Sequence, residues 1–256
     1  MSLVESNAAA SHRLPAPPRA DPASLALFVD IDGTLLDIAA RPDAVVVDVS
    51  LREMLLALHA RLGGALALLS GRSLEDIDGL LDLRELAAAG LHGAELRAAG
   101  GGLLATAQDA PLYAARRRAA EIAQAIPGVL VEDKGAAIAL HYRAVPDAEL
   151  DVRRAAIGLL DLAGPDYDLL QGRCVIELKP HHADKGSALA TLIGTRPFAG
   201  RTPWMIGDDL TDEHAFAEAD ALGGAGIVVG ARRPTVARYA LAGPADARAW
   251  MRSLIP

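Results

Sequence analysis

The chain has 256 residues, of which 52% are hydrophobic and 4% aromatic, and its formal net charge is -8. This length can hold one large domain, or a domain with an inserted module, around a core of aliphatic side chains. The negative charge argues against a nucleic acid or an anionic membrane as partner, so an anionic substrate must meet individually placed cations.

The expected cellular compartment follows from equally simple features. The one cysteine, Cys174, cannot form an intrachain disulfide. No apolar run reaches the roughly 18 residues of a membrane span, and the N-terminal residues around Glu5 lack the basic-then-apolar order of a signal peptide. We therefore expect a cytoplasmic protein. We also expect a monomer whose partner is a small-molecule substrate.

Residues 1–22 are rich in Ala, Ser and Pro without periodicity, which predicts a disordered tail. An apolar run then starts at Leu25 and ends in Asp30 and Asp32, followed by Gly33 and Thr34. This pattern predicts a buried parallel strand that delivers two carboxylates to the sheet edge where ligands bind. Alternatively, one Asp caps a helix and the other lies in a solvated turn.

The next segments repeat this layout. Ser50 is expected to cap a helix over residues 50–62, and a strand over 65–69 ends in Ser70-Gly71-Arg72. Ser73 is expected to cap the following helix. Strand, helix and strand at this spacing predict a parallel sheet.

The pattern changes after a small-residue strand over 86–96, which is interrupted at His92-Gly93 and closed by Glu95. A helix is expected over 112–126, a hairpin over 129–142, a second helix over 150–162 and a strand pair over 168–178. This order predicts an α+β module over 111–179, inserted into an α/β core of residues 23–110 and 180–256. Hinges are expected near Pro111 and Pro180.

The parallel pattern resumes with a helix after Asp184-Lys185-Gly186 and a strand over 204–206, which ends in GDDLTD at 207–212. Separate strand ends thus offer carboxylates, one hydroxyl and one ammonium. Such a set suits Mg²⁺-assisted phosphoryl transfer through an aspartyl-phosphate, because Mg²⁺ prefers oxygen ligands.

These motifs resemble the haloacid dehalogenase superfamily of phosphohydrolases: DIDGT at 30–34, Ser70, Lys185 and GDDLTD appear in the family's order. Within it, the chain resembles the trehalose-6-phosphate phosphatases through SGR at 70–72, GLHGAE at 90–95, VEDKG at 131–135, VIELKP at 175–180 and DKG at 184–186. The resemblance implies a Rossmann-like parallel-sheet core with an inserted α+β cap domain.

The resemblance also implies residue roles. Asp30 is the expected nucleophile and Asp32 the acid and base, while Ser70 and Lys185 hold the phosphoryl oxygens. The expected Mg²⁺ ligands and their supports are Asp30, the backbone carbonyl of Asp32, Asp208, Asp209 and Asp212. Read locally, Ser70 could instead cap a turn and Asp209 and Asp212 could begin a helix.

The cap is expected to select the sugar. Glu132, Lys134 and Glu177 match positions that hydrogen-bond glucose hydroxyls in the family, and a solvated hairpin turn is the alternative. The remaining candidates, expected between core and cap, are Arg72, His92 and Glu95. His92 could equally be a structural histidine.

The function expected from this resemblance is hydrolysis of trehalose 6-phosphate to trehalose and phosphate, in trehalose biosynthesis. The alternatives are a phosphatase for sucrose phosphate or mannosylglycerate phosphate, a phosphomutase, and a phosphosugar sensor without activity. The presence of Asp30 and Lys185 argues against the sensor, and Asp32, which can activate water, favours hydrolysis over phosphomutase transfer.

Overall fold

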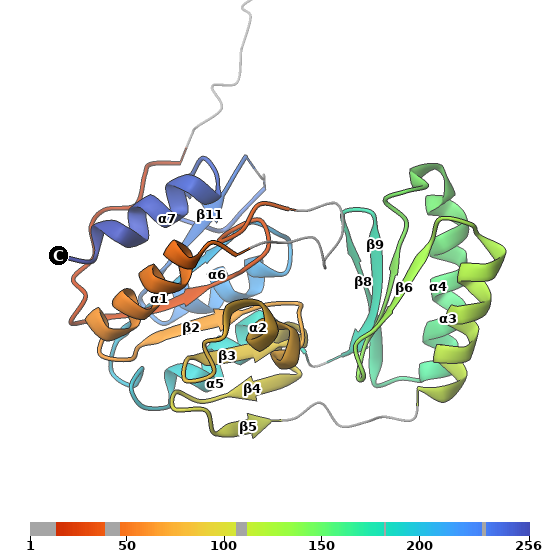
Figure 1. Cartoon of the computed structure of the whole chain (residues 1–256), viewed down its shortest axis with the longest axis horizontal. Helices are drawn as coiled ribbons and strands as arrows, with labels where there is room; N and C mark the ends of the chain where they lie inside the picture. The colour runs from red at the N-terminus through yellow and green to blue at the C-terminus, as the bar shows by residue number, and fades with distance from the viewer. Residues whose placement is uncertain (1–13, 39–46, 106–111, 182, 232–233) are drawn as a thin grey trace, which may run out of the picture.

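The structure is a computed structural model that describes residues 14–38, 47–105, 112–181, 183–231 and 234–256. Its strands form two sheets, one of eight strands in the order β12-β11-β10-β1-β2-β3-β4-β5 and one of four in the order β6-β7-β9-β8 (Figure 1). The strands of the larger sheet are β1 (Leu25–Val29), β2 (Leu66–Leu69), β3 (Ala87–Gly90), β4 (Glu95–Arg97), β5 (Leu103–Ala105), β10 (Thr202–Gly207), β11 (Ala225–Val229) and β12 (Tyr239–Leu241).

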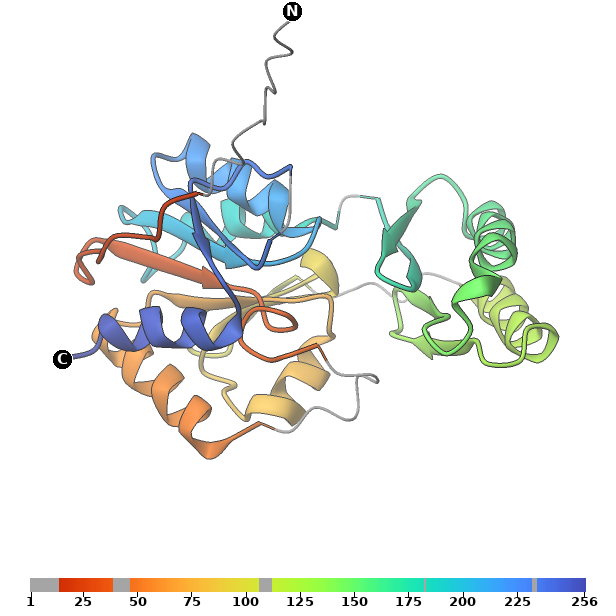
Figure 2. The same cartoon turned by 90° about the horizontal axis from the view of Figure 1, so that it is seen from above.

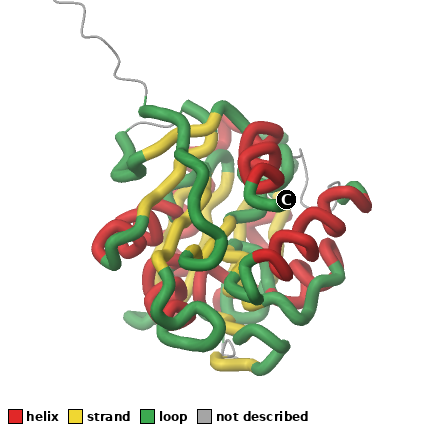
Figure 3. The backbone as a smooth tube through the Cα atoms, turned by 90° about the vertical axis from the view of Figure 1, so that its left-hand side faces the viewer, coloured by secondary structure: helices red, strands yellow, loops and turns green. Residues whose placement is uncertain are grey.

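The larger sheet is parallel from β12 to β3, and β4 and β5 add antiparallel strands at one edge. Its helices are α1 (Val49–Arg61), α2 (Leu74–Leu81), α5 (Lys185–Ile193), α6 (Asp212–Ala221) and α7 (Pro244–Ser253). Helices α1, α2 and α7 cover one face and α5 and α6 the other (Figure 2). Seen from the side, the sheet has helices on both faces (Figure 3). All five residues of β1 are buried, as expected for a central strand with both faces covered. The predicted α/β class with a parallel sheet is confirmed.

The smaller sheet is antiparallel and consists of β6 (Leu130–Asp133), β7 (Ile138–His141), β8 (Tyr167–Gly172) and β9 (Val175–Pro180). Helices α3 (Tyr113–Ala125) and α4 (Glu149–Ala163) lie on the face away from the larger sheet (Figure 1). Ile122, Leu159 and Ile176 belong to a separate apolar core between these helices and the sheet. The opposite face of the smaller sheet is turned toward the larger one (Figures 1 and 2). We call this unit the cap and the larger-sheet unit the core; the exact domain boundaries remain a prediction, and Pro111 lies outside the described residues.

Two local expectations were wrong, and two edge strands were not predicted. The N-cap of α1 is Asp48, whose carboxylate accepts from Ser50 N, because the helix begins one residue before Ser50. The strands β5 and β12 were not predicted, since three-residue edge strands show almost no alternation. The stretch 86–96 is two antiparallel strands, β3 and β4, separated by a 3-10 turn at Leu91–Gly93.

The predicted tail is also partly wrong. Pro15 O accepts a hydrogen bond from Ala240 N at 3.0 Å, and Pro18 O accepts one from Trp250 Nε1 at 3.2 Å. Leu14 packs against the main apolar core. Residues 14–22 therefore belong to the folded core. Hydrogen bonds to their backbone carbonyls and one apolar contact hold them there, and a periodic side-chain pattern is not needed for such contacts. Residues 1–13 lie outside the described part.

Candidate active site

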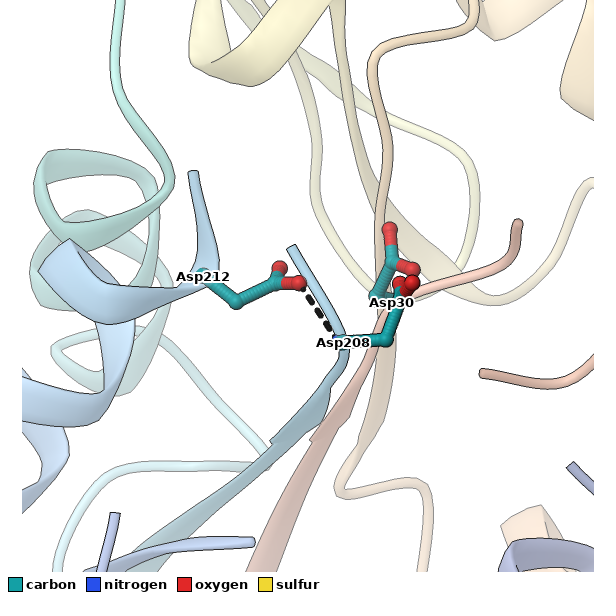
Figure 4. A group of neighbouring side chains, drawn as sticks. All are labelled: Asp30, Asp208 and Asp212. Carbon is teal, nitrogen blue, oxygen red and sulfur yellow. Dashed lines mark hydrogen bonds between the residues drawn. The ribbon is translucent and has the colours of Figure 1, made fainter. Parts of the chain in front are cut away.

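Parallel pairing brings the expected catalytic carboxylates to one edge of the larger sheet. β1 pairs with β10 so that Val29 lies beside Ile206, and Asp30 N donates to Ile206 O at 2.9 Å. Asp30 and Asp208 thus follow adjacent strand ends, and Asp212 begins α6 beside them (Figure 4). One carboxylate oxygen from each of the three lies within 4.8 Å of the other two.

Two glycines allow these carboxylates to come so close. A Cβ atom at Gly33, where φ is +88°, would lie 2.2 Å from Asp208 Oδ2. A Cβ atom at Gly207 would lie 2.2 Å from Asp212 Cγ. Any other residue at either position would displace an acid, so the glycines of both motifs have a direct steric function.

Lys185 joins two of the acids. It is the first residue of α5, whose N-cap is Asp184, and its side chain is buried. Lys185 Nζ donates to Asp30 Oδ1 at 2.6 Å and to Asp212 Oδ1 at 2.7 Å. Burial lowers the pKa of Lys185, but Asp212 and Asp30 outweigh it and hold the pKa above its usual value. The ammonium therefore remains charged at neutral pH.

Asp212 is fully buried and has both oxygens occupied. Beside Lys185 on Oδ1, its Oδ2 accepts from the backbone N–H groups of Asp208 and Asp209, each at 2.9 Å. It therefore orients Lys185 and the loop that carries Asp208. The Asp209 side chain lies outside the trio: it is exposed, and its Oδ1 accepts from Leu210 N at 2.6 Å.

Three carboxylates around one ammonium leave excess negative charge. Burial raises the pKa of Asp30 well above its usual value; Asp212 and Asp208 raise it further, against Lys185. Burial, Asp212 and Asp209 raise the pKa of Asp208 to about 7. A cation bound between Asp30 and Asp208 would remove this repulsion, and carboxylate oxygens are the donors that Mg²⁺ prefers. The residues present fit this ion.

This electrostatic arrangement predicts how stability depends on pH. Folded Asp208 has a pKa of about 7 against 3.8 for a free side chain. In protein stripped of divalent cations, the free energy of unfolding should therefore fall by up to about 4 kcal/mol as pH rises from about 4 to about 7. Mg²⁺ should stabilise the protein more at about pH 7.5 than at about pH 5.5, because it competes with the proton. Thermal unfolding with Mg²⁺ or chelator at both pH values measures this difference.

The matched control is Asp208→Asn, which removes the titrating group and should make the stripped protein less sensitive to pH. An equal stabilisation by Mg²⁺ at both pH values would contradict the assignment of this site to a cation.

Asp32 has a partner that the sequence did not reveal. Arg72 Nε donates to Asp32 Oδ2 and Arg72 Nη2 to Asp32 Oδ1, both at 2.7 Å. The buried Ser70 Oγ accepts from Arg72 N at 3.1 Å, so the loop after β2 places the hydroxyl and the guanidinium together. Arg72, expected only to lie between core and cap, thus orients the Asp32 carboxylate by two parallel hydrogen bonds.

Side chains of the cap meet the core at Glu177. Its Oε2 lies 3.4 Å from His92 Nε2 of the core and 3.4 Å from Lys134 Nζ of the cap. Lys134 Nζ also donates to Gly71 O of the core at 3.0 Å. Burial raises the pKa of Glu177, but Lys134 and His92 outweigh it and lower the pKa to about 2. The structure therefore brings three predicted residues, His92, Lys134 and Glu177, into one charged cluster beside the Ser70 loop.

Two polar atoms in this cluster have no hydrogen-bond partner among the described residues. They are Glu177 Oε1 and His92 Nδ1, and both are buried. An unpaired buried polar atom costs about 1–3 kcal/mol, so such atoms usually mark a place where a polar ligand or water binds.

Glu132 lies on the same sheet face as Glu177. Ala139 of β7 pairs with both, and its small side chain separates the two acids. Glu132 Oε2 lies 2.8 Å from His141 Nε2; although burial raises the pKa of Glu132, His141 and Lys134 lower it on balance. His141 was not predicted as a site residue. Its contact with Glu132 depends on the register of the hairpin, which the sequence does not show.

Glu95 makes a hydrogen bond within the core. Its Oε2 accepts from Leu74 N at 2.7 Å, at the start of α2. Ser73 caps the same helix end, as predicted, through Asp76 N. Two side chains thus satisfy this helix terminus, which gives Glu95 a structural contact, and its role between core and cap stays a prediction.

Comparison with known proteins gives the same picture as the geometry. The sequence model of the trehalose-phosphatase family matches residues 28–245. The chain belongs to the trehalose-phosphatase family. A probable trehalose-phosphate phosphatase of Sinorhizobium fredii is 45% identical over 80% of this chain and 77% of its own length. The trehalose-6-phosphate phosphatase of Escherichia coli is 39% identical over 91% and 87%.

Solved structures support the fold of this family member. A crystal structure of a trehalose-6-phosphate phosphatase related protein has a TM-score of 0.77 at 26% identity, covering 90% of this chain and 96% of that one. The C-terminal domain of Candida albicans trehalose-6-phosphate phosphatase has a TM-score of 0.82 over 94% and 98%, where 21% identity shows the fold alone. A haloacid dehalogenase superfamily phosphatase of Bacteroides thetaiotaomicron has a TM-score of 0.60 at 16% identity, over 93% and 97%. The predicted family is confirmed by the sequence comparisons, and the solved structures confirm the predicted fold.

No helix in the described parts of the chain is long and apolar enough to cross a membrane.

Proposed function

We propose that this family member hydrolyses trehalose 6-phosphate to trehalose and phosphate, with Mg²⁺, through an aspartyl-phosphate on Asp30. The observation that carries the proposal is the opposition of two clusters. Asp30, Lys185 and Asp208 meet at the sheet edge, and Glu177 with Lys134 faces the same loops from the cap. A phosphate bound in the first cluster places its sugar toward the second.

In the first half-reaction, Asp30 attacks phosphorus. Its Oδ1 accepts from Lys185, which leaves Oδ2 as the nucleophilic atom. The bond between phosphorus and the sugar oxygen breaks, and that oxygen takes a proton from Asp32. Bound Mg²⁺, held by Asp30 and Asp208 with support from Asp212, would neutralise charge on the phosphoryl oxygens.

In the second half-reaction, Asp32 takes a proton from water as the water oxygen attacks phosphorus. The bond to Asp30 breaks, and phosphate leaves. Because both Asp32 oxygens accept from Arg72, the proton that Asp32 carries must share an oxygen with one of these hydrogen bonds. Ser70 Oγ and Lys185 Nζ hold the phosphoryl oxygens through both steps.

The cap supplies the preference for a sugar. Glu177 Oε1 and His92 Nδ1 lack partners among the described residues, and sugar hydroxyls can donate to the first and pair with the second. A substrate without hydroxyls would leave these buried atoms unpaired, which disfavours it.

A panel of phosphate esters tests this function. With Mg²⁺, we expect kcat/KM for trehalose 6-phosphate to exceed that for sucrose 6-phosphate, mannosylglycerate phosphate and glucose 6-phosphate by about a hundredfold. Chelator should abolish turnover. Preference for another sugar phosphate would keep the chemistry of Asp30 and reject the substrate; absence of turnover on every ester would reject the function.

A further inference from the structure

Lysine is rare in this chain and is confined to the region between cap and core. Three of the 25 Lys and Arg residues are lysines: Lys134, Lys179 and Lys185. The side chain of Lys134 is 10% exposed and that of Lys185 is 3% exposed, while Lys179 as a residue is 9% exposed. Lys134 and Lys185 have proposed roles toward sugar and phosphate. Lys179 is as buried as they are and has no role in the reaction described above.

Lys179 lies near the end of β9, two residues after Glu177. Because side chains alternate along a strand, the two share one sheet face. Ile176 and Leu178 point the other way, into the apolar core of the cap. The Lys179 side chain is therefore on the face of the smaller sheet that is turned toward the larger-sheet unit.

The ammonium of Lys179 is bonded to the chain that leaves the cap. Lys179 Nζ donates to Ala183 O at 2.5 Å and to Pro180 O at 3.4 Å. Burial lowers the pKa of Lys179, while Asp168, Asp184 and Glu177 oppose this shift. A buried ammonium is costly unless it is hydrogen-bonded, so these carbonyl contacts are the reason that the side chain can be placed here.

Ala183 lies at the junction of the two units. It is fully buried in a small apolar cluster with Leu91 and Ala94 of the core and Ala136 of the cap hairpin. The next residue, Asp184, is the N-cap of α5, whose first residue is Lys185. The backbone segment whose carbonyls accept from Lys179 thus connects β9, the strand of Glu177, to α5, the helix that begins with Lys185.

We propose that Lys179 is a positioning residue that fixes the orientation of the cap over Asp30 by holding the carbonyl groups of Pro180 and Ala183. The inference rests on the proposed function for its substrate. Lys185 is fixed independently by Asp30 and Asp212, so loss of Lys179 affects the placement of Glu177 and leaves the phosphoryl site assembled.

The kinetic test compares two substrates. Lys179→Met keeps the length of the side chain and removes the ammonium. It should lower kcat/KM for trehalose 6-phosphate by about 10- to 100-fold, and for a small aryl phosphate by less than about threefold. Lys179→Arg, which can still donate to both carbonyls, should restore most of the loss. The control is Arg173→Met, which removes an exposed cation from the hairpin of the same sheet and should change neither value.

Two kinetic outcomes would overturn the proposal. One is a Lys179→Met variant with unchanged activity on trehalose 6-phosphate. The other is an equal loss on both substrates, which would mean that the residue supports the fold as a whole.

A second readout does not depend on activity. Spin labels at Val49→Cys in α1, where Val49 is 70% exposed, and Ile157→Cys in α4, where Ile157 is 55% exposed, report the distance between core and cap. Cys174→Ser removes the native thiol. Lys179→Met should broaden the distance distribution and Lys179→Arg should not; an unchanged distribution contradicts the proposal. If the parent protein fails to hydrolyse trehalose 6-phosphate, the proposed function falls and this measurement still decides the role of Lys179.

Discussion

Asp30→Asn is expected to lower phosphate release from trehalose 6-phosphate by more than about a thousandfold, because an amide side chain cannot form the aspartyl-phosphate. Asp30 is buried beside Lys185, Asp208 and Asp212, so no neighbouring carboxylate can take its place without moving its own partners. Initial rates of phosphate release with saturating Mg²⁺ measure the effect.

The fold should survive this substitution. The environment of Asp30 already disfavours its charge, as the raised pKa shows, and Lys185 keeps its bond to Asp212. Thermal unfolding of Asp30→Asn should therefore stay close to that of the parent protein. Asp161→Asn, in an exposed part of α4, is the matched control and should retain full activity. Activity above about a thousandth of the parent value in a folded variant would argue against covalent catalysis by Asp30.

Glu177→Gln should separate sugar recognition from phosphoryl chemistry. The carboxylate is buried, pairs with Lys134 and His92, and has its Oε1 unpaired among the described residues. We expect kcat/KM for trehalose 6-phosphate to fall by about a hundredfold or more, since the amide cannot accept from hydroxyls on both atoms. Activity toward a small aryl phosphate should change by less than about threefold, because that ester needs only the core.

Steady-state kinetics on both substrates give the ratio of kcat/KM for trehalose 6-phosphate to kcat/KM for the aryl phosphate. Glu121→Gln, a half-exposed acid on α3 of the same cap, is the matched control and should leave both values unchanged. A proportional loss on the two substrates would place Glu177 outside sugar recognition and leave it a structural role at the junction of cap and core.

Much of the catalytic edge could be predicted because its signals are local. Asp30 follows a short apolar run directly, and Asp208 follows another after Gly207. Gly33 comes three residues after Asp30 in the same motif. Parallel pairing then brings the strand ends together without further information. The helix cap Ser73 is local for the same reason.

The remaining contacts depend on segments far apart in the chain. Arg72 reaches Asp32 across 40 residues, and His92 reaches Glu177 across 85. Neither pair follows from spacing, because each needs the relative placement of two loops. Glu95 was assigned to the region between core and cap from its motif alone, and its bond to Leu74 N appears only once β4 is folded back beside α2. The backbone bonds of residues 14–22 are unpredictable for the same reason.

The same burial and repulsion of the acidic side chains determine how stability and metal-dependent activity vary with pH. Burial and mutual repulsion raise the pKa values of Asp30 and Asp208, so binding of a cation and ionisation of these acids favour each other. Metal-dependent activity should accordingly rise with pH through about pH 7 at limiting Mg²⁺, and less steeply at saturating Mg²⁺.

Trapping the phosphoryl group on the protein tests the account most directly. Protein mixed with trehalose 6-phosphate and Mg²⁺, quenched in acid and reduced with borohydride, should yield a peptide in which Asp30 is converted to homoserine. The same peptide should be unmodified with chelator, with trehalose alone, or in Asp30→Asn. Steady turnover of trehalose 6-phosphate with Asp30 unmodified, or with the label on a different residue, would contradict the proposal that Asp30 carries the phosphoryl group.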